Sequence, residues 1–255
     1  MSPADDLLSR LRGDLHAHTT WSDGGASLAE MAAVAGELGR EYLAVTDHSP
    51  RLRVANGLSR ERLRAQWDEI ERVQAGRGVR ILRGIEVDIL GDGSLDQADD
   101  LLSRLDVVVA SVHSDLNGPP DVLTARMVGA VSNPHMTVLG HCTGRRRRED
   151  GTWRAASRFD AEVVFAACEM FGVAVEINSR PDRADPPLEL LMLANEIGCL
   201  FSIDSDAHTT AQLGVLRHGA ARAVDAGISP DRIITTWPVD DLLGHAARRR
   251  ARVVD

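Results

Sequence analysis

Short apolar segments alternate with amphipathic segments along almost the whole chain, and this alternation limits the folds that the chain can adopt. The apolar segments predict seven strands, at Gly13–Thr19, Tyr42–Thr46, Val79–Val87, Val107–Val112, Thr137–Gly140, Val173–Ile177 and Leu200–Ser205. The amphipathic segments predict helices between them, at Ser27–Leu38, Ser59–Ala75, Ser94–Leu105, Pro120–Ala130, Ala161–Phe171 and Leu188–Ile197. Nearly all-apolar strands separated by helices indicate parallel strands covered by helices on the outside. The chain therefore reads as an α/β protein, and its length is usual for one α/β barrel.

The first predicted strand carries a His-Ala-His pair, His16 and His18. Successive side chains of an extended strand alternate between its two faces, so these two imidazoles point the same way. Two imidazoles on one face can bind a single metal ion. The first strand therefore predicts a metalloenzyme.

Further metal-capable side chains follow the ends of the later predicted strands: Asp47 and His48, Glu86 and Asp88, His113, His141, and Asp206 with His208. Taken singly, each is better explained as a helix cap or as an ordinary hydrogen-bonded or surface residue than as a ligand. In barrels of parallel strands, however, reacting groups collect at the carboxyl ends of the strands. Their recurrence at these ends predicts one shared site.

Composition fits one globular catalytic domain, because 255 residues of which 44% are hydrophobic can bury a full core. We therefore expect residues 1–255 to form one domain. The net charge is −9 and all 29 basic residues are arginines, which argues against a basic coat for nucleic acid. Aromatic residues make up 4% of the chain, so platforms for base stacking should be few.

Location is predicted from cysteine usage and from apolar runs. The three cysteines are scattered and form no Cys-x-x-Cys pair, which favours free thiols in a reducing compartment. We find no apolar stretch of secretory length near the start and no run long enough to span a bilayer. We expect a cytoplasmic protein with no membrane partner.

Seven motifs in a fixed order carry a family resemblance. They are Asp14-Leu15-His16-Ala17-His18-Thr19 with Ser22-Asp23-Gly24, Thr46-Asp47-His48-Ser49, Gly84-Ile85-Glu86-Val87-Asp88, Ser111-Val112-His113-Ser114, Gly140-His141, Glu176-Ile177-Asn178 and Ser205-Asp206-Ala207-His208. In these motifs the chain resembles the PHP (polymerase and histidinol phosphatase) superfamily. It is most similar to the carboxy-terminal PHP domain of bacterial family X DNA polymerases, through Val54-Ala55-Asn56-Gly57-Leu58-Ser59, Asn133-Pro134-His135 and Thr143-Gly144-Arg145. The resemblance does not extend to the polymerase portion of those proteins.

The resemblance implies a distorted TIM-like (β/α)7 barrel, in a single domain, that holds three divalent metal ions. The implied ligands are His16, His18, Glu86 and Asp206 for the first ion, Glu86, His113 and His141 for the second, and Asp23, His48 and His208 for the third. Many histidinol phosphatases have a histidine at the position of Asp23, so the acid favours the polymerase-associated branch.

Metal chemistry gives independent support, since imidazole and carboxylate without thiolate suit zinc, manganese or iron. We expect Zn²⁺ or Mn²⁺, with Fe²⁺ as a further option. Three carboxylates face three divalent ions in this assignment, so the metal shell is net positive and attracts phosphate. A metal can lower the pKa of water from ~15.7 to about 7, which predicts a hydroxide nucleophile. Glu86 and Asp206 would then serve catalysis as metal ligands.

Several neighbouring residues have two interpretations each. Arg145 and Arg180 are the favoured catalytic pair for gripping phosphate oxygens, whereas Arg146–Arg148 can simply solvate a loop. Asp47 or Asp88 either orients a ligand histidine or caps a helix or turn. Arg51 and Arg53 lie on a loop that either covers the site or stays exposed.

The expected function is a metal-dependent phosphoesterase that hydrolyses phosphomonoesters or phosphodiesters. Resemblance to the polymerase branch implies action on DNA 3′ ends, as exonuclease or phosphatase, and a polymerase or repair partner. Histidinol phosphatase, acting on a phosphorylated small molecule, is the first alternative. A non-catalytic metal-binding module of a DNA repair complex is the second, although the complete ligand set speaks against it.

Overall fold

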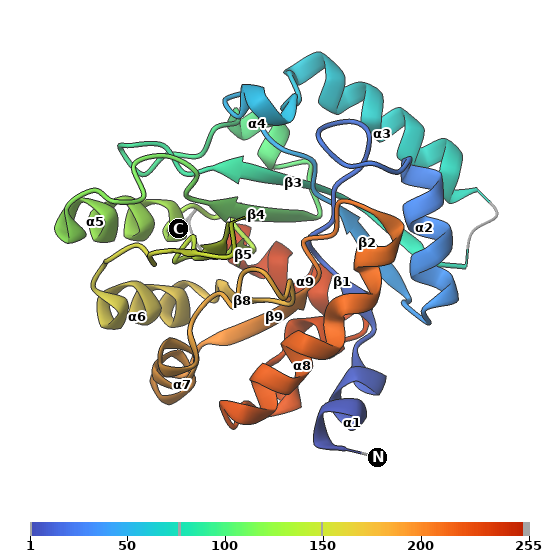
Figure 1. The fold of residues 1–255 in the computed structure, drawn as a ribbon. Helices are drawn as coiled ribbons and strands as arrows, with labels where there is room; N and C mark the ends of the chain where they lie inside the picture. The colour runs from blue at the N-terminus through green and yellow to red at the C-terminus, as the bar shows by residue number, and fades with distance from the viewer. Residues whose placement is uncertain (1, 76–77, 149, 252–255) are drawn as a thin grey trace.

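The computed structural model describes residues 2–75, 78–148 and 150–251. Seven parallel strands form one sheet that curls into a nearly closed barrel (Figure 1). In sheet order they are β1 Gly13–Asp14, β2 Tyr42–Val45, β3 Arg80–Asp88, β4 Val107–Ser111, β5 Val138–Leu139, β8 Ala174–Asn178 and β9 Leu200–Asp204. This arrangement confirms the predicted distorted (β/α)7 barrel.

Helices surround the barrel, most of them on its outside and the last across one end (Figure 1). They are α1 Pro3–Arg10, α2 Leu28–Glu37, α3 Arg60–Gln74, α4 Asp99–Leu102, α5 Pro120–Val131, α6 Ala161–Phe171, α7 Leu188–Ile197, α8 Leu216–Asp225 and α9 Val239–Ala251. Short 3-10 turns lie at η1 Arg53–Ala55, η2 Thr210–Val215, η3 Pro230–Arg232 and η4 Ile234–Thr236. No helix within these described ranges is both long and apolar enough to cross a membrane.

The predicted helix Ser94–Leu105 is wrong over most of its length, since only α4 Asp99–Leu102 is α-helical. Its first residues instead turn back on the end of β3. Leu95 forms an antiparallel bridge with Ile89, and the Ser94 amide donates to Asp92 Oδ1 at 3.0 Å. Gly93 has the left-handed φ of 83° that this turn requires. A turn thus replaces the start of the expected helix.

The first predicted strand, Gly13–Thr19, is a regular strand only over Gly13–Asp14, because side chains interrupt the backbone ladder beyond that point. The Ala17 amide donates to Thr46 Oγ1 at 3.0 Å, and the Leu15 amide donates to Asp204 Oδ1 at 2.9 Å. Within the described chain, β1 and β9 are joined by no ladder, although Ala17 and Ala207 share one bridge. The barrel is distorted at this seam.

The lumen of the barrel changes from apolar to polar along the strands. Leu82 faces an apolar cluster inside the barrel, whereas Glu86 and Asp88, on the same face of β3, are polar and buried. Ile234 of η4 and Leu242 of α9 belong to the inner apolar cluster and close that end. The carboxyl end is therefore left for polar groups, as expected for such barrels.

Candidate metal centre

His16 and His18 both point into the polar end of the lumen, and both are fully buried. Their ring centroids are 5.1 Å apart. His16 Nδ1 lies 2.5 Å from Glu176 Oε1, and this contact turns Nε2 toward Glu86, at 3.4 Å from Oε2. His18 Nε2 lies 3.5 Å from Asp206 Oδ1. The alternation of the strand thus produces the histidine pair that the sequence predicts.

Glu86 lies at the centre of the site, with histidines around both carboxylate oxygens. Oε2 is 3.4 Å from His16 Nε2, 3.6 Å from His18 Nε2 and 2.9 Å from His48 Nδ1. Oε1 is 3.3 Å from His113 Nε2 and 2.9 Å from His141 Nε2. These five histidines come from segments that follow or end four different strands, so one buried carboxylate joins distant parts of the chain.

Asp23 forms a second focus at the rim, where its side chain is 33% exposed. Its oxygens lie 3.6 Å from His48 Nε2, 3.5 Å from His208 Nε2 and 3.9 Å from His18 Nδ1. The loop that carries it is anchored by Asp47, which accepts hydrogen bonds from the amides of Thr19 and Ser22 at 2.8 and 3.1 Å. Asp47 therefore positions the loop that carries the candidate ligand Asp23.

Asp88 contacts a candidate ligand histidine directly, because its Oδ1 lies 2.5 Å from His113 Nδ1. Such a contact fixes the proton on Nδ1 and leaves Nε2 free for a metal. Of the two interpretations of Asp88, the structure has the one in which it orients a histidine.

The nine predicted ligands form four overlapping groups whose ligand atoms lie within 4.8 Å of one another. These groups are His18, Asp23, His48 and His208; His16, Glu86 and His141; His16, His18 and Asp206; and His48, Glu86 and His113. Every predicted ligand is in at least one group. The groups differ in detail from the predicted sets, since His18 also approaches Asp23 and His48 also approaches Glu86.

The donors fit divalent metal ions by their chemistry and by their unmet hydrogen bonds. Six buried nitrogen and oxygen atoms of the candidate ligands make no well-formed hydrogen bond, although some lie as close as 2.9 Å to an atom of another candidate ligand: His16 Nε2, His18 Nδ1 and Nε2, His48 Nδ1, Glu86 Oε1 and His141 Nδ1. Buried polar atoms without partners are rare and costly unless an ion or water satisfies them. Imidazole and carboxylate together suit divalent ions such as zinc and manganese.

The electrostatics of the metal-free cluster show how strongly its charges interact. Burial disfavours charge on Glu86, but His16, His48 and other histidines outweigh it and hold the pKa of Glu86 well below its usual range. Burial likewise opposes charge on His48, yet Glu86 and Asp23 raise the pKa of His48 to about 10. Burial and two neighbouring histidines lower the pKa of His18 to about 3. A metal ion bound at His48 would therefore have to displace a proton.

Asp206 is held in a fixed orientation by its backbone and by two partners. Its φ of 49° is left-handed, which is uncommon for a residue other than glycine and often marks a functional site. Its Oδ2 lies 2.8 Å from Arg183 Nε and accepts from Asn178 Nδ2 at 3.0 Å. Oδ1 is left to face His16 and His18.

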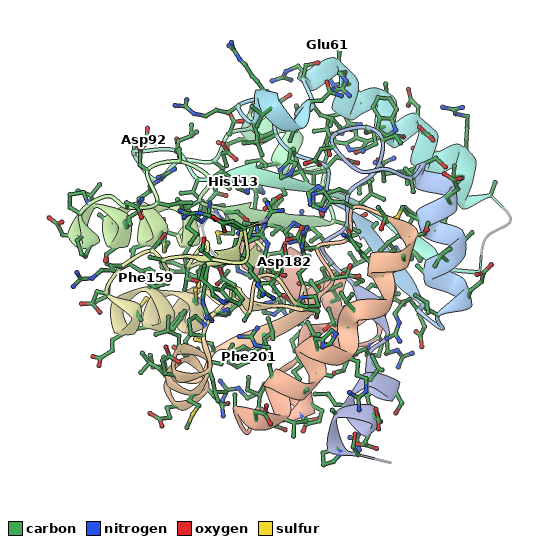
Figure 2. The ribbon with its side chains drawn as sticks, in the orientation of Figure 1. Glu61, Asp92, His113, Phe159, Asp182 and Phe201 are labelled. Carbon is green, nitrogen blue, oxygen red and sulfur yellow. The ribbon has the colours of Figure 1, made fainter. Side chains whose placement is uncertain are left out.

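A cavity of about 380 Å³ opens above these ligands. It is lined by Asp23, His48, Leu52, Val54, Ala55, Glu86, His113, Arg146, Arg180, Arg183, Asp206, His208 and Gln212. In Figure 2, His113 and Asp182 lie toward the middle of the molecule, whereas Glu61 and Asp92 lie at its edge. We call this space the metal-site cavity.

The structure separates the two predicted phosphate-binding arginines. Arg180 lines the metal-site cavity and makes a two-point ion pair with Asp182, at 3.0 Å for each contact. Arg145 does not line it; its guanidinium stacks on Trp153, with Cζ 4.2 Å from the ring centroid. Arg146 and Arg183 stand at the cavity in its place.

The loop that follows His48 does reach the metal-site cavity, but not through its arginines. Leu52, Val54 and Ala55 line the cavity, and neither Arg51 nor Arg53 does. The loop therefore adds apolar side chains to a cavity that is also lined by Arg146, Arg180 and Arg183.

Sequence reasoning missed the role of Glu176, although the residue stands in one of the recognised motifs. Its Oε1 contacts His16, and its Oε2 accepts from the His141 amide at 2.6 Å. The available signal was alternation, because Glu176 and Asn178 lie on one face of an otherwise apolar strand.

Sequence comparison identifies proteins that are similar to this chain. The 255-residue chain is 42% identical, over 85% of its length, to DNA polymerase/3′-5′ exonuclease PolX of Bacillus subtilis. The aligned part is 37% of that longer protein. The present chain is also 29% identical to a protein named "Probable phosphatase" from Thermoanaerobacter sp., over 88% of this chain and 89% of that one.

A solved structure supports the fold, and a family model supports the membership. Histidinol phosphate phosphatase from Lactococcus lactis, solved with zinc, L-histidinol and phosphate, matches with a TM-score of 0.59 and 17% identity, over 86% of this chain and 95% of that one. The sequence model of the PHP domain matches residues 14–205, which include all the candidate ligands but Asp206 and His208. The chain therefore belongs to the PHP domain family.

Proposed function

We propose that this metal-dependent phosphoesterase of the PHP domain family hydrolyses phosphate esters at a cluster of three divalent ions in the metal-site cavity. One observation carries the proposal: the two oxygens of buried Glu86 lie between 2.9 and 3.6 Å from nitrogens of five histidines. A purely structural carboxylate would not need five histidines around it, because a buried polar group is normally satisfied by one or a few hydrogen-bond partners. Residues 1–255 would act as one domain.

The proposed ligand sets follow the sequence prediction. His16, His18, Glu86 and Asp206 would hold one ion, Glu86, His113 and His141 a second, and Asp23, His48 and His208 a third, with zinc or manganese as the metal. When bound, such ions supply an activated water as nucleophile and draw charge from phosphate oxygens.

The remaining residues of the site orient these ligands and bind the substrate. Glu176 and Asp88 keep the proton on Nδ1 of His16 and His113, so that each Nε2 remains a ligand. Arg180 would bind phosphate oxygens after exchanging its contact with Asp182 for the substrate. Arg146 would take the part that we predicted for Arg145, which is engaged with Trp153.

We propose the phosphoester at the 3′ end of a nucleic acid as the substrate. The 42% identity to PolX of Bacillus subtilis, which is named as a 3′-5′ exonuclease, supports this choice. The acid at Asp23 supports the same branch. Histidinol phosphate is the second candidate, which the fold of the Lactococcus protein favours.

Phosphate release from p-nitrophenyl phosphate, with added manganese or zinc, tests the reaction. We expect metal-dependent turnover that His16→Ala abolishes, because His16 is a buried ligand in two of the four groups. His218→Ala is the matched control, since His218 is an exposed histidine of α8. No turnover on any phosphoester, with metal bound, would favour the non-catalytic module.

Side-by-side assays then separate the two substrate candidates. A 3′-recessed oligonucleotide and histidinol phosphate are compared by kcat/KM at equal metal loading. We expect the oligonucleotide to be the better substrate. A higher kcat/KM for histidinol phosphate would overturn the choice of substrate and leave the reaction class intact.

A further inference from the structure

Beside the metal-site cavity lies a short hairpin that the sequence analysis did not predict. It pairs β6 Arg146–Arg147 with β7 Trp153–Arg154 in an antiparallel ladder, in which Arg146 is opposite Arg154. Like charges directly opposite each other in a ladder are destabilising. The β6–β7 hairpin therefore carries a cost that a bound anion would relieve.

Charge around this hairpin is unbalanced. Among the described residues, a pocket of about 640 Å³ is lined by Arg146, Arg147, Arg148, Asp150 and Arg154, which is four arginines to one acid. Asp150 keeps its negative charge, and its carboxylate is held at the turn by hydrogen bonds from the Thr152 amide and hydroxyl at 2.9 and 2.6 Å. No carboxylate of the described residues is within ion-pair distance of Arg147 or Arg148.

Neighbouring guanidinium groups also affect one another. Burial, followed by the charges of Arg183 and Arg146, lowers the pKa of Arg154. Arg154 is nevertheless fixed in place, since its Nε donates to the Gly144 carbonyl at 2.7 Å. The pocket is thus a built concentration of positive charge on a protein whose overall charge is −9.

The hairpin pocket adjoins the metal-site cavity at Arg146, which lines both. Asp182 links the two walls: its carboxylate contacts Arg146 at 3.5 Å and Arg180 at 3.0 Å, and its carbonyl accepts from the Arg147 amide at 2.6 Å. A substrate whose phosphate lies on the metal ligands would therefore extend directly over the hairpin.

We propose that the β6–β7 hairpin is a second phosphate-binding subsite, which takes a phosphate other than the one hydrolysed in the metal-site cavity. The ligand chemistry is a phosphorylated group attached to the reacting ester, as in an oligonucleotide strand or a nucleoside bisphosphate. Trp153, 41% exposed beside Arg145, adds an aromatic surface on which a base can stack. This inference rests on the proposed function, because it assumes that the reacting phosphate lies in the cavity.

Fluorescence anisotropy with a labelled oligothymidine tests the subsite, using phosphorothioate linkages that resist hydrolysis. The binding constant is measured at several salt concentrations for wild type and for Arg147→Gln/Arg148→Gln. Single-strand binding loses ~0.7 in the slope of log K against log salt per phosphate contact, so we expect the slope to fall by about 1.4. Arg10→Gln/Arg64→Gln removes the same charge from exposed arginines elsewhere and should leave the slope unchanged.

Competition in the same assay identifies the source of the second phosphate. Thymidine 3′,5′-bisphosphate should displace the strand better than thymidine 3′-monophosphate from wild type, and this advantage should vanish in the hairpin variant. If the variant alters only the bisphosphate advantage, the subsite stands and its ligand is a small bisphosphate. Equal slopes and equal competition for wild type and hairpin variant would overturn the proposal.

An assay of p-nitrophenyl phosphate hydrolysis distinguishes failure of the subsite proposal from failure of the proposed function. The compound has one phosphate, so wild type and Arg147→Gln/Arg148→Gln should hydrolyse it equally. Turnover with unchanged strand binding in the variant refutes the subsite alone. Hairpin-dependent binding without any turnover refutes the phosphoesterase reaction and retains the subsite as a binding site.

Discussion

Glu176→Gln should weaken metal binding although it removes no metal ligand. One carboxylate holds two sides of the cluster: Oε1 is 2.5 Å from His16 Nδ1, and Oε2 accepts from the His141 amide at 2.6 Å. A glutamine has one oxygen and one NH2 group, so it can accept from only one of these two partners. If the NH2 group faces His16, it selects the tautomer with the proton on Nε2, which cannot bind metal.

The expected size of the effect follows from these contacts. Losing one hydrogen bond that involves a charged group costs about 1.5–3 kcal/mol. Removal of a carboxylate that orients a metal-binding histidine typically costs ~10- to 100-fold in metal affinity, which is about 1.4–2.8 kcal/mol. The two estimates agree, so we expect a decrease in affinity within this range.

Competition with a chromogenic chelator measures this affinity for zinc or manganese. Glu169→Gln is the matched control, because Glu169 is an exposed glutamate of α6 and should leave affinity unchanged. Thermal unfolding in excess chelator checks that the variant is folded. A folded Glu176→Gln protein with the affinity of wild type would refute the reasoning.

Four further outcomes are expected. Asp88→Asn should lower metal affinity and raise the metal concentration that gives half-maximal turnover, because the variant loses the carboxylate contact with His113. Metal titrations identical to those of wild type would contradict this. Chelation should lower the Tm by removing ligands that bind only the folded state, and a Tm unaffected by metal would count against the site. Metal affinity should rise as the pH is raised toward 10, because His48, whose pKa is raised from 6.5 to about 10, must release its proton; isothermal titration at several pH values checks the sign. Leu242→Ala should cost roughly 2–5 kcal/mol in urea unfolding, since it opens the inner apolar cluster, yet should leave metal stoichiometry unchanged; metal loss would contradict a separate polar end.

Local sequence patterns were sufficient to predict those site residues whose side-chain direction depends on a single extended segment. The two-residue alternation of His16 and His18 predicts a shared face, and the structure has both imidazoles in the lumen. The carboxyl ends of parallel strands then brought Glu86 and His113 together, as the barrel prediction required. Each of these inferences needed only the direction of a side chain along one strand.

Hydrogen bonds in which a distant side chain takes the place of a backbone partner could not be predicted in this way. Asp204 accepts the amide of Leu15, 189 residues earlier, and so replaces the ladder that the first strand was expected to form. The role of Glu176 also depends on which histidine its strand meets across the barrel. Such partners are set by the closed geometry, which no single segment contains.

The arginine run illustrates a further limit. Sequence alone favoured Arg145 for the cavity, but the β6–β7 ladder alternates the run between two faces and stacks Arg145 on Trp153 instead. Arg146 therefore reaches the cavity. A short ladder of two residue pairs, formed only after the chain has folded back, decided which arginine is at the site.

Metal content is the most direct measure of the central claim, that Glu86 joins one cluster of three divalent ions. Elemental analysis would be made on wild-type protein and on Glu86→Gln, both purified without chelator and confirmed as folded. We predict three ions per chain in wild type and fewer in the variant, which loses the carboxylate shared by five histidines. A single ion per wild-type chain, or the same metal content in both proteins, would contradict the account.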